Sequence, residues 1–149
     1  MINEGLKLRG DVALVLKDKD GNIKEQREEK NLVVSTGLNF ICDRMEGTSE
    51  AVMSHMAVGS DNTAPVAGDT DLGSILGSRE ALDSTTVTDN TITYVSSFEA
   101  GEGTGSIVEA GIFNASTAGT MLCRVVFGTI TKAADDTLQI TWTITLTAS

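Results

Sequence analysis

Near the end of the chain, apolar and polar side chains alternate over ten positions, in the segment TLQITWTITL. Leu138, Ile140, Trp142, Ile144 and Leu146 share one parity, and threonine or glutamine takes the positions between them. Successive side chains of a β-strand point to opposite faces of its sheet, so this alternation predicts a strand with one buried face. Those five apolar residues are the predicted core positions.

Other strand-like segments precede it, separated by turn signals at roughly ten-residue spacing. They cover residues 6–16, 22–34, 53–59, 85–98, 106–113 and 121–131, with 85–98 read as a hairpin turning at Asp89-Asn90. No long helical segments lie between them, as a parallel α/β sheet would require. The pattern therefore predicts a mainly β fold, an antiparallel sandwich or barrel-like domain.

The chain divides by charge and periodicity into two predicted parts. Residues 1–34 form a charged β-hairpin that projects as an arm, with its turn at DKDG, and residues 35–149 form the sandwich domain. A helix near 36–45 leads into that domain, with Ser35 or Thr36 as its N-cap. Its predicted apolar face consists of Leu38, Ile41, Cys42 and Met45. A second, weaker helical turn is predicted at 69–76, capped by Asp69 or Thr70.

The net charge of −10 restricts the partners of the protein. It argues against binding to nucleic-acid backbones and to anionic membrane surfaces, both of which need clustered cations. Eight of the eleven basic residues nevertheless lie within residues 1–50. The hairpin could therefore contact a partner protein. The candidate partner-binding residues are Lys17, Lys19, Lys24, Arg27 and Lys30.

No segment predicts catalysis, and no cofactor or metal site is predicted. DKDGN lacks the ligand spacing of a calcium loop, and GEGTG lacks the lysine and helix of a phosphate loop. His55 is the sole histidine and has no predicted catalytic partners. For two further sets of residues, a functional and a structural interpretation both stay open. Asp61, Asp69 and Asp71 could hold a divalent ion or form local turns, and Tyr94 and Trp142 could stack on a sugar or lie in the core.

Four further motifs carry a resemblance to a known group. GSDNTAP at residues 59–65 is followed by DTDLG at 69–73, EAGIFN at 109–114 and TWTIT at 141–145. Together with NLVVSTGLNFICDRM at 31–45, these segments resemble a group of small structural proteins of tailed bacteriophages, over roughly residues 31–149. The segment Ser60-Asp61-Asn62 departs from the more glycine- and threonine-rich loop expected of that group.

The resemblance implies a virion component without enzymatic activity. The leading interpretation is a capsid decoration (cement) protein that binds the major capsid protein and other virion proteins as a homo-oligomer, with a trimer as one form. It would be made in the host cytoplasm and reside on the capsid surface or the tail. A tail or tail-fibre-associated adaptor is the alternative within this class, and a carbohydrate-binding β-sandwich module is the alternative from another class.

Overall fold

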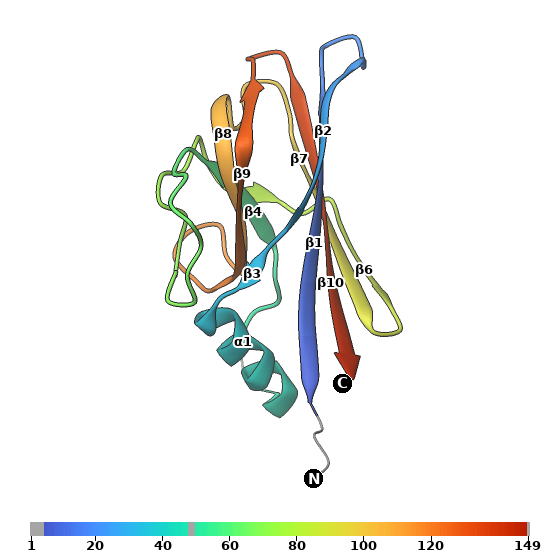
Figure 1. Cartoon of the computed structure of the whole chain (residues 1–149), viewed down its shortest axis with the longest axis vertical. Coiled ribbons are helices and arrows are strands. Elements are labelled where there is room, and N and C mark those ends of the chain that lie inside the picture. The colour runs from blue at the N-terminus through green and yellow to red at the C-terminus, as the bar shows by residue number, and fades with distance from the viewer. Residues whose placement is uncertain (1–4, 48–49, 149) are drawn as a thin grey trace.

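Two antiparallel sheets face each other in the computed structural model, which describes residues 5–47 and 50–148 (Figure 1). The first, sheet A, has the order β2 (Ile23–Lys30), β1 (Leu6–Lys17), β10 (Thr137–Ala148), β7 (Thr91–Phe98), β6 (Ser84–Thr88). The second, sheet B, has the order β3 (Leu32–Val33), β9 (Met121–Lys132), β8 (Gly105–Phe113), β4 (His55–Gly59), β5 (Glu80–Ala81). The helix α1 (Ser35–Glu46) follows β3. The predicted mainly β, antiparallel sandwich is confirmed.

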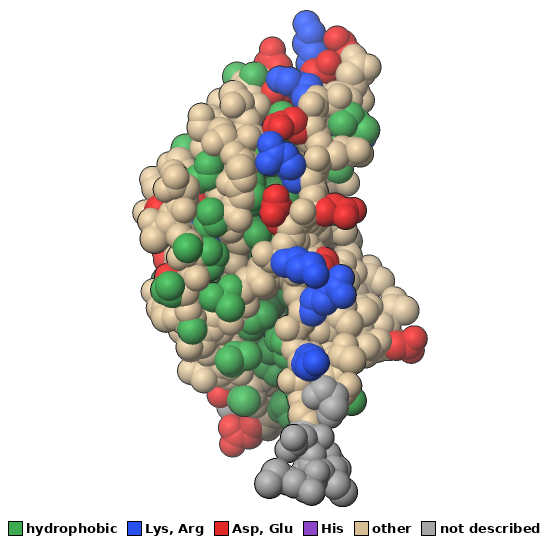
Figure 2. All heavy atoms as spheres, in the orientation of Figure 1, with side chains coloured by type: hydrophobic (Ala, Val, Ile, Leu, Met, Phe, Trp, Pro, Cys, Tyr) green, Lys and Arg blue, Asp and Glu red, His purple; other side chains and the backbone are tan. Residues whose placement is uncertain are grey.

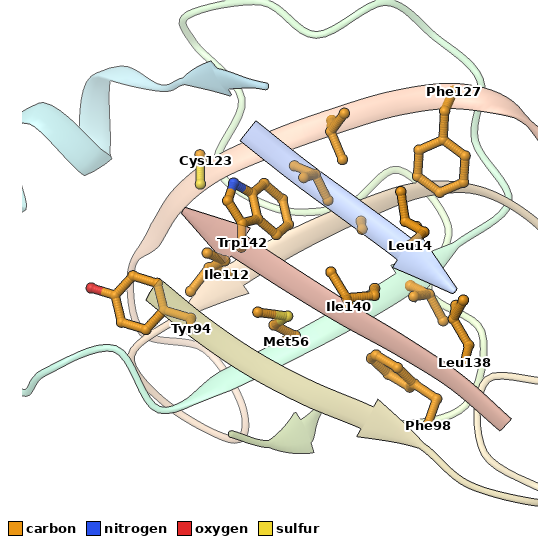
Figure 3. Close-up of a cluster of buried hydrophobic side chains, with 14 of the residues drawn as sticks. Leu14, Met56, Tyr94, Phe98, Ile112, Cys123, Phe127, Leu138, Ile140 and Trp142 are labelled. Atoms are coloured by element: carbon orange, nitrogen blue, oxygen red, sulfur yellow. The ribbon is translucent and has the colours of Figure 1, made fainter. Parts of the chain in front are cut away.

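The alternating segment is the central strand of sheet A, where β10 pairs with β1 on one side and β7 on the other. Its inward side chains meet those of sheet B in the main core (Figure 3). Leu138, Ile140, Trp142 and Ile144 are buried there. Leu146 is only half-buried, near the free end of the strand, and packs against the margin of the core.

The N-terminal hairpin differs from its prediction as a projecting arm. β1 lies inside sheet A, between β2 and β10, and pairs with β10 along its whole length. Its side chains Val12, Leu14 and Leu16 are buried in the main core. Residues 1–34 therefore belong to the sandwich, and only the turn between β1 and β2 extends beyond the body (Figure 1). That turn is closed by Asp18, whose carboxylate accepts backbone N–H bonds from Asp20 and Asn22.

The predicted strand at 22–34 is broken at Asn31, where the chain crosses from sheet A to sheet B. Asn31 is held at this crossing by its backbone N–H, which donates to Gly10 O, and by its Oδ1, which accepts from Trp142 Nε1 at 2.7 Å. A Cβ at Gly10 would overlap the Asn31 amide, so glycine is the residue that admits this close approach. One buried indole N–H thus fixes the position of the crossing.

The helix has the predicted place, but its cap and its buried face differ from the prediction. Val34 occupies the N-cap position without a side-chain bond, and the Thr36 hydroxyl donates instead to Met121 O on β9. Gly37 lies directly against the Leu122 carbonyl, which brings the helix backbone onto β9. The buried face is therefore centred on Gly37 and Phe40. Of the four predicted apolar residues, Leu38, Cys42 and Met45 are exposed and Ile41 is half-buried.

Of two further predictions, one is wrong and one is confirmed. Residues 69–76 form no helical turn. The hairpin at 85–98 has the predicted register, with Thr88 opposite Thr91 and Val87 opposite Ile92. Asp89 takes the left-handed conformation at its turn, with φ of 52°. Within the described residues, no helix is long and apolar enough to cross a bilayer.

Candidate functional site

The most elaborate polar arrangement in the described chain lies on the outer face of sheet B, beneath the loop of residues 60–79. This face carries a small apolar cluster of its own, formed by Val34, Ala57, Leu72, Phe113 and Met121. Leu72 comes from the loop and the others from the sheet and its margins. The loop is therefore a packed layer over sheet B. Three of the segments that carry the phage resemblance, at 59–65, 69–73 and 109–114, meet here.

Glu109 is the centre of this arrangement. It lies on β8 with 0% of its surface exposed. Its carboxylate accepts N–H bonds from Asp61 at 2.8 Å, Gly73 at 2.9 Å and Ser74 at 3.0 Å, all from the overlying loop. Arg124 Nε donates a fourth bond at 3.1 Å. A buried carboxylate is costly unless it is paired and hydrogen-bonded, and both conditions are met here.

Arg124, on the neighbouring strand β9, extends the network. Its side chain is 3% exposed. Nη1 donates to Thr63 O at 3.0 Å and to Asp69 Oδ2 at 3.1 Å, and Nη2 donates to Asp61 O at 3.3 Å. The planar guanidinium thus joins the sheet to two parts of the loop at once. The carboxylate and the guanidinium, already bound to each other, therefore both hold the loop against sheet B.

The acidic loop residues take local structural roles. Asp61 Oδ1 accepts the N–H of Thr63, and hydrogen bonds from the Thr63 side chain and backbone lower the pKa of Asp61. Asp69 Oδ2 accepts the N–H of Val66, and Asp71 Oδ1 accepts that of Leu72. Asp69 therefore closes a turn and does not cap a helix. Across the described residues, no group of three or more His, Cys, Asp or Glu side chains is arranged to hold a metal ion.

A second arginine anchors the far end of the loop. The Arg79 guanidinium carbon lies 3.6 Å from the centroid of the Phe113 ring. Its Nη1 donates to Ala115 O at 2.9 Å and Ala118 O at 2.7 Å. The Arg79 side chain is 7% exposed. This cation–π contact and the two carbonyl bonds join the loop to the β8–β9 connection, so the guanidinium is not free to bind a ligand.

The five basic hairpin residues separate into two sets. Lys24 forms an ion pair with Asp136 at 2.7 Å, and Arg27 pairs with Glu25 and donates to Gly128 O and Thr129 O on β9. Both therefore join the open edge of sheet A to sheet B or to the turn that follows it. Lys17, Lys19 and Lys30 are exposed. Lys and Arg side chains form a column along this side of the molecule in Figure 2.

The Lys24–Asp136 pair predicts a pH dependence. The hydrogen bond from Lys24, aided by the N–H of Ala133, lowers the pKa of Asp136 below its ordinary value. The stabilisation is therefore complete above the unfolded pKa of about 3.9 and is lost as the pH falls through the folded value. We expect Lys24→Met to raise the pKa of Asp136, measured by NMR titration of the carboxyl carbon. Lys19→Met, which removes an exposed cation of the same hairpin, should leave it unchanged.

The structure also shows the surroundings of His55 and of the two aromatic residues Tyr94 and Trp142. Ser54 Oγ lies 2.8 Å from His55 Nδ1, although adjacent side chains within a β-strand point to opposite faces. Ser54 precedes β4, so strand alternation does not apply to it. Trp142 is 0% exposed and Tyr94 is 6% exposed, and burial raises the pKa of Tyr94 to about 12. Both aromatic rings thus occupy the core and present no stacking surface.

Comparisons of the chain with protein-family models, with curated proteins and with solved structures found no match.

The sequence interpretation missed Glu109 and Arg124. A signal was present, because each is the single charged residue of a largely apolar strand segment, SIVEAGIF and MLCRVVF. Charged side chains are rarely fully buried unless they are paired. Opposite charges in two neighbouring apolar strands therefore indicate a buried pair. In the structure Arg124 lies opposite Gly111, two residues from Glu109 on the same face.

Proposed function

We propose that the protein is a non-enzymatic structural component of a tailed-bacteriophage virion, and that it acts as a capsid decoration protein. The observation that carries this proposal is that residues of the resemblance segments bind one another within the fold. Three of the segments that resemble phage structural proteins, at 59–65, 69–73 and 109–114, meet at the Glu109–Arg124 network, where their polar groups form hydrogen bonds. These hydrogen bonds hold the loop at 60–79 rigidly against sheet B. The proposed role requires a rigid surface of this kind.

The decoration role follows from mass action. A protein that binds the assembled lattice of major capsid protein, and not the separate subunits, stabilises the lattice. Such binding requires a rigid module with an accessible contact surface. The sandwich supplies the module, and the exposed lysines of the β1–β2 hairpin (Lys17, Lys19 and Lys30) supply cationic groups that would pair with acidic groups of the capsid.

Electron microscopy and mass spectrometry of separated heads and tails test the proposal. Decoration predicts the protein on heads, in regular positions on the shell. Detection only on tails would overturn the decoration role and favour the adaptor role. Absence from both would overturn the virion proposal altogether.

The carbohydrate-binding alternative depended on Tyr94 and Trp142 as stacking surfaces, and both are buried in the core.

A variant pair tests the contact surface. We expect Lys17→Glu with Lys19→Glu to weaken binding to isolated shells by roughly tenfold or more, because like charges replace complementary ones. Lys7→Glu is the matched control, since Lys7 is also exposed but lies at the opposite end of β1. Binding is measured by co-sedimentation with shells. Equal loss from both changes would mean that the hairpin tip is not the contact surface.

A further inference from the structure

Of the four sheet edges in the described chain, one is left without protection. Exposed edge strands can pair with other chains, and proteins usually protect them by charge or by keeping them short. In sheet B both edge strands, β3 and β5, have two residues. In sheet A the edge strand β2 carries six charged residues among its eight. The remaining edge strand, β6, is Ser84–Thr88, with no charge, and all five of its residues are exposed.

We propose that β6 is a self-association site, at which a second copy of this chain adds its own β6 antiparallel to the first across a two-fold axis. The inference concerns this edge alone and does not depend on the virion proposal.

The backbone of β6 has groups available for this pairing. The Asp89-Asn90 turn places Thr88 opposite Thr91, and the pairing with β7 continues to Ser84. In an antiparallel ladder, alternate residues turn their N–H and C=O toward the partner strand and the others turn away. With Thr88 and Thr91 closing the two-residue hairpin as a bonded pair, Thr85 and Val87 present their backbone groups to the open side.

The side chains favour one register. Val87 is 67% exposed, although it shares a face of the sheet with the half-buried Ile92. An axis through Val87 sets Val87 against Val87 of the second copy and removes both from water. It also sets Thr86 against Thr88 of the second copy, a favourable cross-strand combination. An axis through Thr86 would instead set Asp83 against Asp89, and like charges directly opposite each other are destabilising.

Charge is the reason to choose a second copy as the occupant. A strand without charge is complementary to itself, whereas it offers no counter-charge to a strongly charged partner. The net charge of −10 on each copy opposes association at low salt. A five-residue strand also buries less area than a stable dimer interface needs. We therefore expect a weak, reversible dimer that strengthens as salt screens the repulsion.

Sedimentation equilibrium of the full chain tests the site. Wild type should show a monomer–dimer equilibrium, tighter at higher salt. Val87→Lys and Val87→Glu should each weaken the dimer by roughly tenfold or more, because each sets two like charges at the axis. An equimolar mixture of these two variants should recover association, because opposite charges then meet. Ile23→Lys on β2, another exposed apolar residue, is the control and should leave the dimer unchanged.

Several results would overturn this site. They are a wild-type chain that stays monomeric at every accessible concentration and salt, a trimer formed without a dimer, and Val87 variants that associate as wild type does. Failure of the mixture to recover association would overturn the axis at Val87. Thermal unfolding of each variant checks that the fold is retained, which the exposure of Val87 leads us to expect.

Discussion

Replacing Arg124 with methionine is expected to lower the free energy of unfolding by about 3–5 kcal/mol, the usual cost of removing one partner from a buried ion pair. The Glu109 carboxylate would remain fully buried and lose its counter-charge. The carbonyls of Asp61 and Thr63 would lose their donor, and so would the Asp69 carboxylate. Urea unfolding followed by circular dichroism measures the loss.

Arg9→Met is the matched control. Arg9 also forms an ion pair, with Asp11 at 2.8 Å, but the Arg9 side chain is 62% exposed. Exposed pairs contribute about 0–1 kcal/mol, so this change should be close to neutral. Hydrogen exchange of the loop at 60–79 supplies a second measurement, since Arg124→Met should speed exchange there more than in β10. Similar losses of stability in both variants would contradict a structural role for the buried pair.

Trp142→Ala is expected to cost about 3–5 kcal/mol as well, for a different reason. The ring is the largest fully buried side chain of the described chain, and its removal leaves a cavity between the two sheets (Figure 3). Its Nε1 bond to Asn31 Oδ1 would also be lost, at the point where the chain crosses between sheets. Thermal and urea unfolding measure the effect.

Two companion changes separate these contributions. Trp142→Phe keeps an aromatic ring but removes the N–H donor, and should cost about 1–3 kcal/mol through the unsatisfied Asn31 oxygen and the lost volume. Thr143→Ala alters the opposite, half-exposed face, where the hydroxyl lies 3.3 Å from Thr93 Oγ1. It should cost less than either tryptophan change. A loss from Thr143→Ala as large as that from Trp142→Ala would show that the threonine face is buried in an assembly.

Local sequence signals predicted the features that depend on neighbours along the chain. Alternation identified the strand at 137–146, because the pleat sends successive side chains to opposite faces whatever the partner strand is. The Asp89-Asn90 turn set the register of the hairpin between β6 and β7, because a two-residue turn determines which residues lie opposite each other. The place of α1 followed from its periodicity. Each of these predictions needed only contacts between residues close in sequence.

The features that were predicted wrongly depend on distant segments. The buried face of α1 is set by the Leu122 carbonyl against Gly37, a contact that helical periodicity does not contain. Residues 1–34, predicted to form an arm, belong to the sandwich because Val12, Leu14 and Leu16 pack in the main core. In addition, Lys24 and Arg27 bind groups more than 100 residues away in the sequence. Two of the five candidate partner-binding residues are used in this way within the fold.

The sequence by itself determined the class of the fold, most of the strand segments and the alternating strand with Trp142 at its middle. The tertiary structure alone decided where the chain crosses between the sheets and what the charged residues do. Glu109 and Arg124 are 15 residues apart, and their loop partners lie 35 to 63 residues away. Hydrogen bonding between such residues is settled by the packing of one layer on another, because desolvation makes each buried charge dependent on partners that only the folded chain brings within reach.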